Sequence, residues 1–452
     1  LLYSTIVRNK TNTNIFHYSL GLSPYRSGGL TRYSEDLMKQ QVSKGHNVSV
    51  LFPSGISFFN QRMNITKSER MGIKIYCINN PTPVSLYHGI KKPMDFYSNL
   101  EYDEKVFEDV VDEVNPDVFH IHTLMGLPLK ILNLLHDRGV KIVYTSHDYF
   151  GLCLKTNFID IHNHLCDGPS ASKCAYCNQN APSTSFLRFR NEPCVLALKN
   201  KLKKYLKFQD EGMTGHKKLS DDCYINSYEY EKLIDYYHQI FSYINKFHFN
   251  SLLSESIYIR NLKIKDSVVI PITNSSISDN RVFKSFENRL KICFIGSTKI
   301  FKGFPMLKSV LMNFKDADWS LDVWGGGIGT DQDLDKIRYR GKFDHCYLKD
   351  IYMGCDLVIV PSVWYETFSF VVLEALSYGT PVAVSTHVGA KDLVKEYGPK
   401  FIFNGADQLR LLLHELISNK DELKKYNHNI INKGWYHSMK DHCLEIENNL
   451  YL

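Results

Sequence analysis

Short apolar strands alternate with helical stretches in both halves of this 452-residue chain, and this alternation limits the possible folds more than any other feature of the sequence. In the first half, the pattern predicts strands over residues 14–20, 47–52, 117–121 and 141–145. Between them it predicts helices over residues 30–44, 106–114 and 128–137. Strands that alternate with helices form a parallel sheet whose two faces are covered by helices.

A second alternating unit follows a polar stretch at residues 273–280, which we interpret as a linker. Its predicted strands are residues 290–295, 320–324, 356–360 and 381–384. A chain of this length is too long for one ordinary core. We therefore predict an α/β protein with two doubly wound parallel-sheet domains, residues 1–280 and 281–430, that face each other across a cleft. Open α/β sheets bind their ligands at the carboxyl ends of the strands, so we expect the site in this cleft.

The strongest functional signal lies where the predicted strand 356–360 runs into a loop and then into a helix. The backbone amides near Phe368 and Ser369 are then unpaired donors at a helix start, which attracts phosphate. Glu366 and Glu374 are eight positions apart, about 12 Å if both stood on one helix at roughly 1.5 Å per residue. Hydrolytic carboxylate pairs are closer, at about 5 to 9.5 Å. Two separate contacts along an elongated ligand fit this spacing better.

This segment resembles the donor site of the retaining glycosyltransferase family 4, also called glycosyl transferases group 1. The resemblance rests on Glu366 and Glu374 at the family's Glu-x7-Glu spacing, followed by Gly379-Thr380-Pro381-Val382. It covers residues 14–394 and is strongest from Leu290 onward. It implies the GT-B fold, in which two Rossmann-like domains face a central cleft. In that fold residues 1–280 form the acceptor side, residues 281–430 bind the nucleotide sugar, and a helix in residues 431–452 crosses back to the first domain.

The resemblance also implies an activity. Such an enzyme moves a sugar from a UDP- or GDP-linked donor to a saccharide or lipid-linked saccharide acceptor, as in cell-surface polysaccharide synthesis. The anomeric configuration is retained, and the departing phosphate helps to deprotonate the incoming hydroxyl, so catalysis requires no metal or other cofactor. This chemistry depends on positioning and charge stabilisation. In the family's pattern, Glu366 contacts the donor-sugar hydroxyls and Glu374 the nucleotide ribose.

A second donor-site segment follows the predicted strand 290–295 and begins at Gly296. A glycine-containing loop between a strand and a helix suits a phosphate, and the resemblance places the ammonium of Lys302 on the donor diphosphate. The family commonly has an arginine just after the first glycine, whereas Ser297 stands here. Arg26 and Lys299 are the candidates to replace it, and whether either does so stays open.

Three more site candidates lie in the first domain. Gly28 and Gly29 precede the predicted helix 30–44, and adjacent glycines let a backbone approach a ligand closely. His122 and His147 follow predicted strands that end at the cleft. The resemblance identifies His147 with the family's site histidine, which contacts the donor sugar and the reacting region, and it places His122 on the same wall. His147 and Glu366 are therefore the catalytic candidates, with a structural role as the alternative for each histidine.

A cysteine-rich, basic insertion at about residues 150–220 interrupts the alternation. Cys153, Cys166, Cys174 and Cys177 fall within 25 residues, the last two as Cys-x2-Cys. Four thiolates can form a tetrahedral zinc site that fixes a loop too short to build its own core. Unbound thiols and an iron–sulfur cluster are the alternatives. Residues 1–10 lack the layout of a secretory signal, so we expect the cytoplasm, where clustered cysteines more often bind metal than form disulfides.

Basic and large apolar residues are mixed at residues 186–190 and 199–208. A basic amphipathic helix can lie on an anionic membrane or pack on its own domain. Peripheral contact with the inner face of the membrane is therefore one interpretation of this segment. No apolar run approaches the roughly 20 residues of a membrane-spanning helix.

Other functions remain to be weighed. A nucleotide-sugar epimerase or phosphorylase shares the two-domain plan, but the lysine and the two spaced glutamates favour transfer. A dehydrogenase is disfavoured because no Gly-x-Gly-x-x-Gly follows the first strand. The cysteines and basic segment permit a zinc-containing nucleic-acid-binding protein, although a net charge of +6 does not demand one, and we expect no nucleic-acid partner. An inactive scaffold of the same fold is the last alternative.

Overall fold

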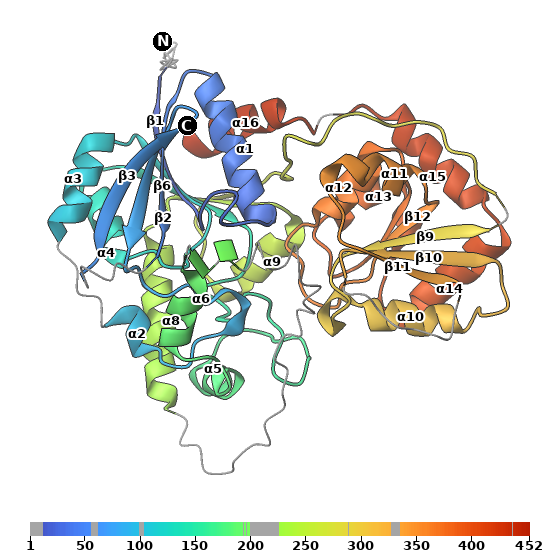
Figure 1. Cartoon of the computed structure of the whole chain (residues 1–452), viewed down its shortest axis with the longest axis horizontal. Helices are drawn as coiled ribbons and strands as arrows, with labels where there is room; N and C mark the ends of the chain where they lie inside the picture. The colour runs from blue at the N-terminus through green and yellow to red at the C-terminus, as the bar shows by residue number, and fades with distance from the viewer. Residues whose placement is uncertain are drawn as a thin grey trace, which may run out of the picture.

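The computed structural model describes residues 12–55, 62–98, 104–192, 194–195, 197–198, 226–287, 289–326, 335–435 and 437–452. Figure 1 shows two α/β bodies side by side, each built around one sheet. Chain order and colour place most of the first half in one body and most of the second half in the other. The two domains predicted from the alternation are therefore present as two separate sheets with their own helices.

The first sheet has eight strands in the order β3-β4-β2-β1-β5-β6-β7-β8. Its strands are β1 (Asn14–Tyr18), β2 (Asn47–Pro53), β3 (Asn64–Arg70), β4 (Ile73–Asn79), β5 (Val118–Ile121), β6 (Lys141–Ser146), β7 (Lys246–Phe249) and β8 (Ser267–Val269). Neighbours are parallel except at the β3–β4 pair, which is antiparallel. The strand order reverses between β1 and β5, so a crevice for a ligand opens beyond their carboxyl ends.

The second sheet has six strands, all parallel, in the order β11-β10-β9-β12-β13-β14. Its strands are β9 (Leu290–Ile295), β10 (Trp319–Trp324), β11 (Ile337–Gly341), β12 (Leu357–Val360), β13 (Val382–Ser385) and β14 (Ile402–Phe403). Here the order reverses between β9 and β12. The prediction of two doubly wound parallel sheets is confirmed.

Helices cover both sheets. Those of the first domain are α1 (Gly29–Ser43), α2 (Met94–Tyr97), α3 (Glu104–Val114), α4 (Leu129–Asp137), α5 (Ala171–Asn178), α6 (Thr184–Asn191), α8 (Ser227–Ser242) and α9 (Leu252–Asn261). Those of the second are α10 (Phe304–Met312), α11 (Leu348–Met353), α12 (Phe370–Ser377), α13 (Lys391–Tyr397), α14 (Gly405–Ser418) and α15 (Asp421–Asn432). None of these described helices combines the length and the apolar character that crossing a membrane requires.

Local sequence explains the elements that position the site. β12 has the sequence Leu-Val-Ile-Val and is buried throughout, as expected of a parallel strand covered on both faces. The helical spacing of Leu30, Tyr33, Leu37 and Gln41 predicts a stripe along one side of α1, and the last three are buried while Leu30 is partly buried. The helix ends where Gly45 adopts a left-handed φ of 91° and His46 N–H donates to the Gln41 carbonyl, a glycine-based helix end.

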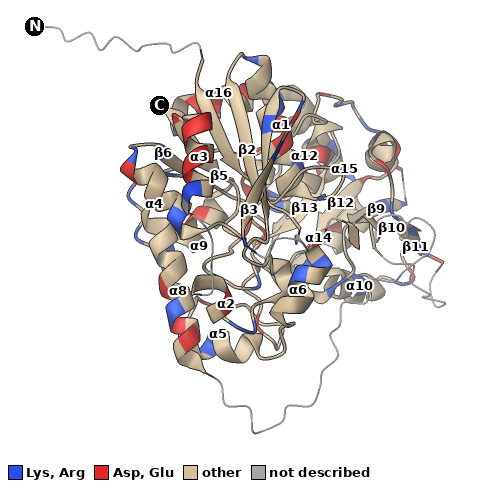
Figure 2. Ribbon diagram, turned by 60° about the vertical axis from the view of Figure 1, so that its left-hand side comes forward, with Lys and Arg blue, Asp and Glu red and all other residues tan. Residues whose placement is uncertain are grey.

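The last helix, α16 (Met439–Ile446), and the π-helical turn Glu447–Tyr451 return to the first domain. Figures 1 and 2 both show α16 beside α1. His442 on α16 lies 2.8 Å from the hydroxyl of Tyr33 on α1, measured from Nε2, and Lys44 forms an ion pair with Glu447. The C-terminal segment is therefore part of the core of the first domain.

Some elements differ from the sequence prediction. The antiparallel edge strand β3 was not predicted, because its residues are polar and mostly exposed and so leave no apolar pattern. The apolar pattern at residues 239–243 also predicts regular structure, and these residues form the end of α8 and its C-cap, after which the strand β7 follows. In the predicted linker 273–280, Thr273 and Asn274 are buried. This connection is packed into the molecule because its hydroxyls bond to other segments.

Candidate active site

The carboxyl ends of the two sheets meet across a closed interface between the domains. Thr367 of the second domain donates from its hydroxyl to the carbonyl of His147 at 3.1 Å, and its own carbonyl accepts from the hydroxyl of Ser251 at 2.6 Å. Arg32 on α1 lies 2.8 Å from His345 of the second domain, from Nη1 to Nε2. The loop that carries Glu366 is thus in contact with the end of β6, where His147 lies.

The two glycines of the first domain face the start of α12. Gly28 is the N-cap of α1, with a φ of 127°, and a Cβ there would meet nothing within 4 Å. A Cβ on Gly29 would lie 3.2 Å from Cε2 of Phe370, the first residue of α12. The backbone at Gly28 is therefore open to a ligand, while Gly29 lets the two helix starts approach each other.

The start of α12 has the features of an anion site. Ser369, its N-cap, has a φ of 101°, a conformation that is strained for a non-glycine residue, and its own side chain does not cap the first amides of the helix. Such uncapped amides favour an anionic ligand. Phe368 is buried and its carbonyl accepts from the amide of Ala390 at 2.9 Å. Its contribution to a ligand site is consequently limited to the backbone.

The loop after β9 approaches the end of β12 closely. Gly296 follows β9 with a φ of 147°, and Gly303 caps α10 with a φ of 74°. A Cβ on Gly303 would lie 1.8 Å from the carbonyl oxygen of Pro361, so only glycine fits here. This close approach brings Lys302 beside the loop that carries Glu366.

Lys302 and Glu366 form an ion pair, with Nζ 2.9 Å from Oε1. The other carboxylate oxygen accepts from the hydroxyl of Ser362 at 2.5 Å, and the Trp364 ring centroid lies 5.0 Å from Nζ. The Lys302 side chain is 26% exposed and that of Glu366 is 13% exposed. Both charged groups are therefore held in place at the cleft while remaining accessible to a ligand.

Glu374 lies apart from this pair, inside α12. It accepts a 2.7 Å hydrogen bond from the hydroxyl of Tyr352, and its side chain is buried. Burial raises the pKa of Glu374, while the Tyr352 bond and the positive charge of Arg32 act in the opposite direction. Arg32 belongs to α1 of the first domain, so the electrostatic environment of Glu374 depends on both domains. Sequence reasoning missed Arg32.

His147 lies at the end of β6 and is half-buried at the interface. Burial, and then the proximity of His248, lower its pKa to about 3. His122 does not line the cleft as predicted, because its side chain is fully buried behind His147. Its Nδ1 lies 3.4 Å from Nε2 of His147. Any effect of His122 on a ligand must therefore pass through His147.

Of the two cations considered as replacements for the missing arginine, Lys299 shares the loop of Lys302, whose amide donates to its carbonyl at 3.0 Å, and Arg26 lies in the first domain. Arg26 lines a cavity of about 240 Å³ in the first domain, together with Arg70, and donates to Asn191 at 2.9 Å. Burial and the nearby Arg190 lower the pKa of Arg26 to about 10. Lys299 lies 5.7 Å from the Tyr87 ring centroid. Arg26 therefore lies in a cavity of the first domain.

The four clustered cysteines line one cavity of about 470 Å³ together with His162. All four are free thiols, and burial raises the pKa of Cys153 to about 11 and that of Cys174 to about 12. The four are not a closed metal site in this arrangement. Among the residues that the structure describes, the one group whose ligand atoms all lie within 4.8 Å of one another is His17, His120 and His122.

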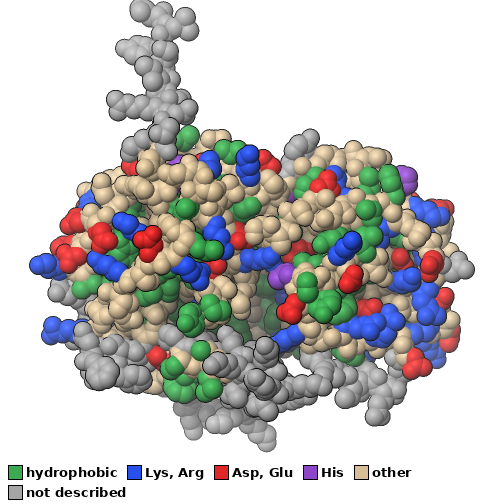
Figure 3. All heavy atoms as spheres, turned by 45° about the horizontal axis from the view of Figure 1, so that its top comes forward, with side chains coloured by type: hydrophobic (Ala, Val, Ile, Leu, Met, Phe, Trp, Pro, Cys, Tyr) green, Lys and Arg blue, Asp and Glu red, His purple; other side chains and the backbone are tan. Residues whose placement is uncertain are grey.

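Charges are mixed over the described surface. Figure 2 shows blue and red segments together on α8, and Figure 3 shows basic, acidic and apolar side chains interspersed over the visible face of both domains. Nucleic-acid-binding proteins gather their positive charge into a patch or stripe. The predicted basic segment 199–208 lies outside the described residues.

Comparison with known proteins adds an independent finding. The family model described as "Glycosyltransferase Family 4" matches residues 27–166, and the one described as "Glycosyl transferases group 1" matches residues 277–434. A Klebsiella pneumoniae protein described as "Uncharacterized 42.6 kDa protein in cps region" is 22% identical over 396 residues, which cover 82% of this chain and 84% of the relative.

Solved structures share the fold. A glycosyltransferase from Rickettsia africae superimposes with a TM-score of 0.57 at 15% identity, covering 98% of each chain. Anabaena Alr3699/HepE, solved in complex with UDP and glucose, gives a TM-score of 0.53 at 13% identity and covers 97% of this chain and all of that one, 100%. Both likenesses extend over the two domains.

Proposed function

Because this chain belongs to glycosyltransferase family 4 and is a GT-B enzyme that transfers a sugar from a nucleotide sugar, we propose that its transfer retains the anomeric configuration of the donor. The retention rests on membership of the family; the observation that carries the donor site of this proposal is the ion pair of Lys302 and Glu366 beside the start of α12. One cation, one helix start and one carboxylate at the same point suit a diphosphate joined to a sugar. The Anabaena structure that contains UDP and glucose has the same fold, which supports such a ligand.

In this proposal the second domain holds the donor. The ammonium of Lys302 and the amides that follow Ser369 bind the diphosphate, which the glycine backbone at Gly296 also approaches. Glu366 accepts hydrogen bonds from sugar hydroxyls. Glu374 binds the ribose, and its carboxylate is oriented by the Tyr352 hydroxyl at 2.7 Å.

The reaction then breaks the bond between the anomeric carbon and the phosphate oxygen and forms a bond from that carbon to the acceptor oxygen on the same face. The acceptor hydroxyl gives its proton to the departing phosphate. Lys302 and the helix amides offset the negative charge that develops on this phosphate, which is the type of contribution expected from fixed charges in a closed site. His147 and the Gly28 backbone stand across from the sugar on the first domain.

For the acceptor we propose a saccharide or lipid-linked saccharide that carries an anionic group. The cavity of about 240 Å³ in the first domain holds two guanidinium groups, those of Arg26 and Arg70, of which Arg70 is paired with Glu35 at 3.7 Å. Arg26 forms no ion pair among the described residues, and its charge is further opposed by Arg190. A buried cation without a carboxylate partner is stabilised by an anion. A place in surface polysaccharide synthesis is supported by the relative encoded in a cps region.

For the cysteine-rich insertion we propose a structural zinc ion held by Cys153, Cys166, Cys174 and Cys177. α5 presents Cys174 and Cys177 one turn apart, and the other two thiols line the same cavity. The ion would replace four protons, and the thiols would have to turn toward each other to reach about 2.3 Å from it.

Peripheral membrane contact through the basic segment 199–208 is proposed as the way in which the enzyme meets a lipid-linked acceptor. Co-sedimentation of the full chain with anionic vesicles at low and high salt tests it. We expect binding at low salt that weakens as the salt concentration rises. Absence of binding at both salt concentrations contradicts membrane contact.

The donor assignment is tested by thermal unfolding with UDP-, GDP- and other nucleotide sugars. One of them should raise the melting temperature of the wild-type protein and of Lys349→Ala, an exposed change on α11 of the same domain. It should have little effect on Lys302→Ala. Equal stabilisation of all three proteins contradicts the proposed site.

The acceptor assignment has its own test. We expect Arg26→Gln to raise the KM for an anionic acceptor by about 10-fold or more while the donor KM is unchanged, because a charged hydrogen bond is lost only on the acceptor side. Arg289→Gln, which removes an exposed arginine paired with Asp318, is the matched control. A raised KM for the donor with an unchanged KM for the acceptor would contradict the proposal that Arg26 binds the acceptor.

A further inference from the structure

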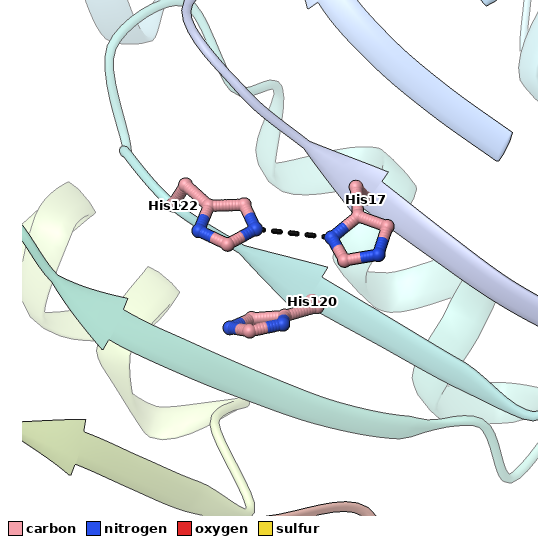
Figure 4. Close-up of side chains that lie close together, drawn as sticks. All are labelled: His17, His120 and His122. Atoms are coloured by element: carbon pink, nitrogen blue, oxygen red, sulfur yellow. Dashed lines mark hydrogen bonds between the residues drawn. The ribbon is translucent and has the colours of Figure 1, made fainter. Parts of the chain in front are cut away.

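A continuous series of hydrogen bonds runs through the core of the first domain, from a backbone carbonyl to His147 at the cleft. It lies between the sheet and the segments α1 and 447–451, and Figure 4 shows three of its imidazoles. Starting from the carbonyl of Ile270, the members are His248, Thr145, His120, Tyr451, Gln41, His17, His122 and His147. We name this series the histidine relay. A neutral imidazole has one N–H and one acceptor nitrogen, so the direction of each bond can be derived from its neighbour.

The donor and the acceptor of each hydrogen bond can be assigned from the Ile270 end of the relay, which lies away from the cleft. The carbonyl oxygen of Ile270 can only accept, so Nε2 of His248, 2.7 Å away, carries the proton. Nδ1 of His248 then accepts from the hydroxyl of Thr145 at 2.9 Å. Because this hydroxyl has one proton, the 2.7 Å bond between Thr145 and Nε2 of His120 must be donated by His120.

Tyr451 and Gln41 form the next hydrogen bonds of the relay, which lead to α1, and their donors and acceptors can be assigned in the same way. Nδ1 of His120 accepts from the hydroxyl of Tyr451 at 2.8 Å, and the Tyr451 oxygen accepts from Nε2 of Gln41 at 2.9 Å. Oε1 of Gln41 lies 2.8 Å from Nε2 of His17, which therefore donates. An amide has its donor and its acceptor on opposite sides, so Gln41 transmits the direction from the tyrosine to the histidine.

Three histidines complete the relay. Nδ1 of His17 accepts from Nε2 of His122 at 3.0 Å, the bond drawn in Figure 4, and Nδ1 of His122 accepts from Nε2 of His147 at 3.4 Å. Burial lowers the pKa of His17 to about 4 and that of His122 well below its usual value, so both are neutral at pH 7. His147 consequently keeps its proton on Nε2. Its Nδ1 has no hydrogen-bond partner in the part of the chain that the structure describes.

We propose that the histidine relay fixes the tautomer of His147 so that Nδ1 accepts a hydrogen bond from a hydroxyl group of the bound sugar. The proposal rests on the proposed function, which brings a sugar into the cleft. The opposite tautomer would present an N–H there, which suits an oxygen without a proton, such as a phosphate oxygen. Gln41, His17 and Tyr451 are positioning residues, because they are remote from the cleft and act only through His147.

A metal site is the competing interpretation of the same histidines, since the ligand atoms of His17, His120 and His122 lie within 4.8 Å of one another. The relay opposes it. Each of these imidazoles already uses its acceptor nitrogen for a proton from a neighbour, and its other nitrogen donates. A metal ion would need the same lone pairs, so binding one would break the relay.

The test is the tautomer of His147 in protein labelled with ¹⁵N in histidine, measured by long-range proton–nitrogen NMR at pH 7 and assigned with a His147→Gln variant. We expect a protonated Nε2 and an unprotonated Nδ1. Tyr451→Phe removes one hydroxyl and lets the Gln41 amide turn over, so His147 should also populate the Nδ1–H form. Gln41→Met removes the amide itself and should have the same effect by an independent change.

Tyr426→Phe is the matched control, because it removes a buried hydroxyl whose bond goes to Val382 in the other domain. It should leave the His147 signals unchanged. A proton on Nδ1 of His147 in the wild type, or an unchanged tautomer in both relay variants, overturns the proposal. About one equivalent of zinc that survives dialysis and is lost from a His17→Ala variant would also overturn it.

Activity gives a second readout. We expect Tyr451→Phe to lower kcat/KM about 10-fold, the usual effect of one misdirected hydrogen bond, and to add little to the loss in His147→Ala. Full additivity of the two losses contradicts action through His147. The tautomer of His147 is measured without a nucleotide sugar present. A failure of the relay proposal is therefore distinguishable from a failure of the proposed function, which would appear as absence of nucleotide-sugar binding.

Discussion

Replacement of Lys302 by alanine should affect catalysis far more than folding. Nζ of Lys302 lies 2.9 Å from Oε1 of Glu366, and the two side chains are 26% and 13% exposed. A partly exposed ion pair contributes about 0 to 1 kcal/mol to stability, because water screens it and two side chains must be ordered. The contact with the Trp364 ring at 5.0 Å adds about 0.5–1 kcal/mol. The free energy of unfolding should therefore fall by no more than about 2 kcal/mol.

The effect on catalysis is worked from the charge that develops during transfer. In the proposed donor site, the ammonium of Lys302 would offset negative charge on the departing diphosphate. Removal of one such stabilising group typically slows an enzyme by about 10²–10³-fold, or about 2.7–4 kcal/mol. We expect kcat/KM of Lys302→Ala to be at least about 100-fold below the wild-type value.

The assay is release of nucleoside diphosphate under steady-state conditions, with unfolding in guanidinium chloride measured on the same preparations. Lys349→Ala, an exposed lysine of the same domain, controls for the loss of a positive charge. Glu366→Gln and the double variant with Lys302→Ala complete a thermodynamic cycle. Because the two groups contact each other and one ligand, the double variant should lose less than the sum of the single losses.

Wild-type turnover of Lys302→Ala would refute the reasoning, since no other cation of the second domain contacts Glu366 among the described residues. A loss of activity that follows a loss of folded protein would refute it as well. Glu374→Ala should also slow transfer about 100-fold, and wild-type turnover in both variants would reject the donor site as a whole.

Three further predictions concern stability and metal content. Gly303→Ala should destabilise the protein by several kcal/mol more than Gly139→Ala in denaturant unfolding. The two glycines have similar φ values, 74° and 69°, but only a Cβ at Gly303 would meet backbone, 1.8 Å from the carbonyl oxygen of Pro361. Equal losses of unfolding free energy in the two variants would contradict this clash. Burial raises the pKa of Asp148 from 3.8 to about 6, so the folded state favours the protonated carboxyl group. This stabilising contribution is lost as the pH rises from about 4 through 6. Asp148→Asn should therefore be more stable than the wild type at pH 7, by up to about 3 kcal/mol, with no difference near pH 4. Purified protein should contain about one equivalent of zinc that is lost in Cys174→Ser, and less than about half an equivalent in the wild type would reject the zinc site.

Much of the fold could be predicted because parallel strands buried on both faces are continuous apolar runs, as in Leu357–Val360. α1 could be predicted from the helical spacing of Tyr33, Leu37 and Gln41, which all lie against the sheet. The strand Asn64–Arg70 could not be predicted. It is an exposed edge strand that forms by backbone hydrogen bonding to β4, so its sequence has no apolar pattern.

The proximity of Lys302 and Glu366 could be predicted because each stands in a loop that follows a strand of the same sheet. The contribution of Arg32 to Glu374 could not, since it arises only when the domains dock. One signal was available: Arg32 stands in the first turn of α1, where the helix dipole disfavours a cation, so an anionic neighbour from elsewhere was to be expected. The burial of His122 behind His147 depends on the register of the sheet and could not be predicted from the sequence motifs either.

The chain passes between the domains twice, and the two passages are bonded to each other. The hydroxyl of Thr273 donates to the carbonyl of His437 at 2.6 Å, and Arg281 donates to the carbonyl of Lys433 at 2.7 Å. A pair of connections tied in this way acts as a single hinge, which permits rotation of one domain against the other and resists sliding between them. Substrate entry and product exit should therefore proceed by swinging the far edge of the cleft apart. A protease cut at residues 276–280 should leave the two halves attached and the hinge intact.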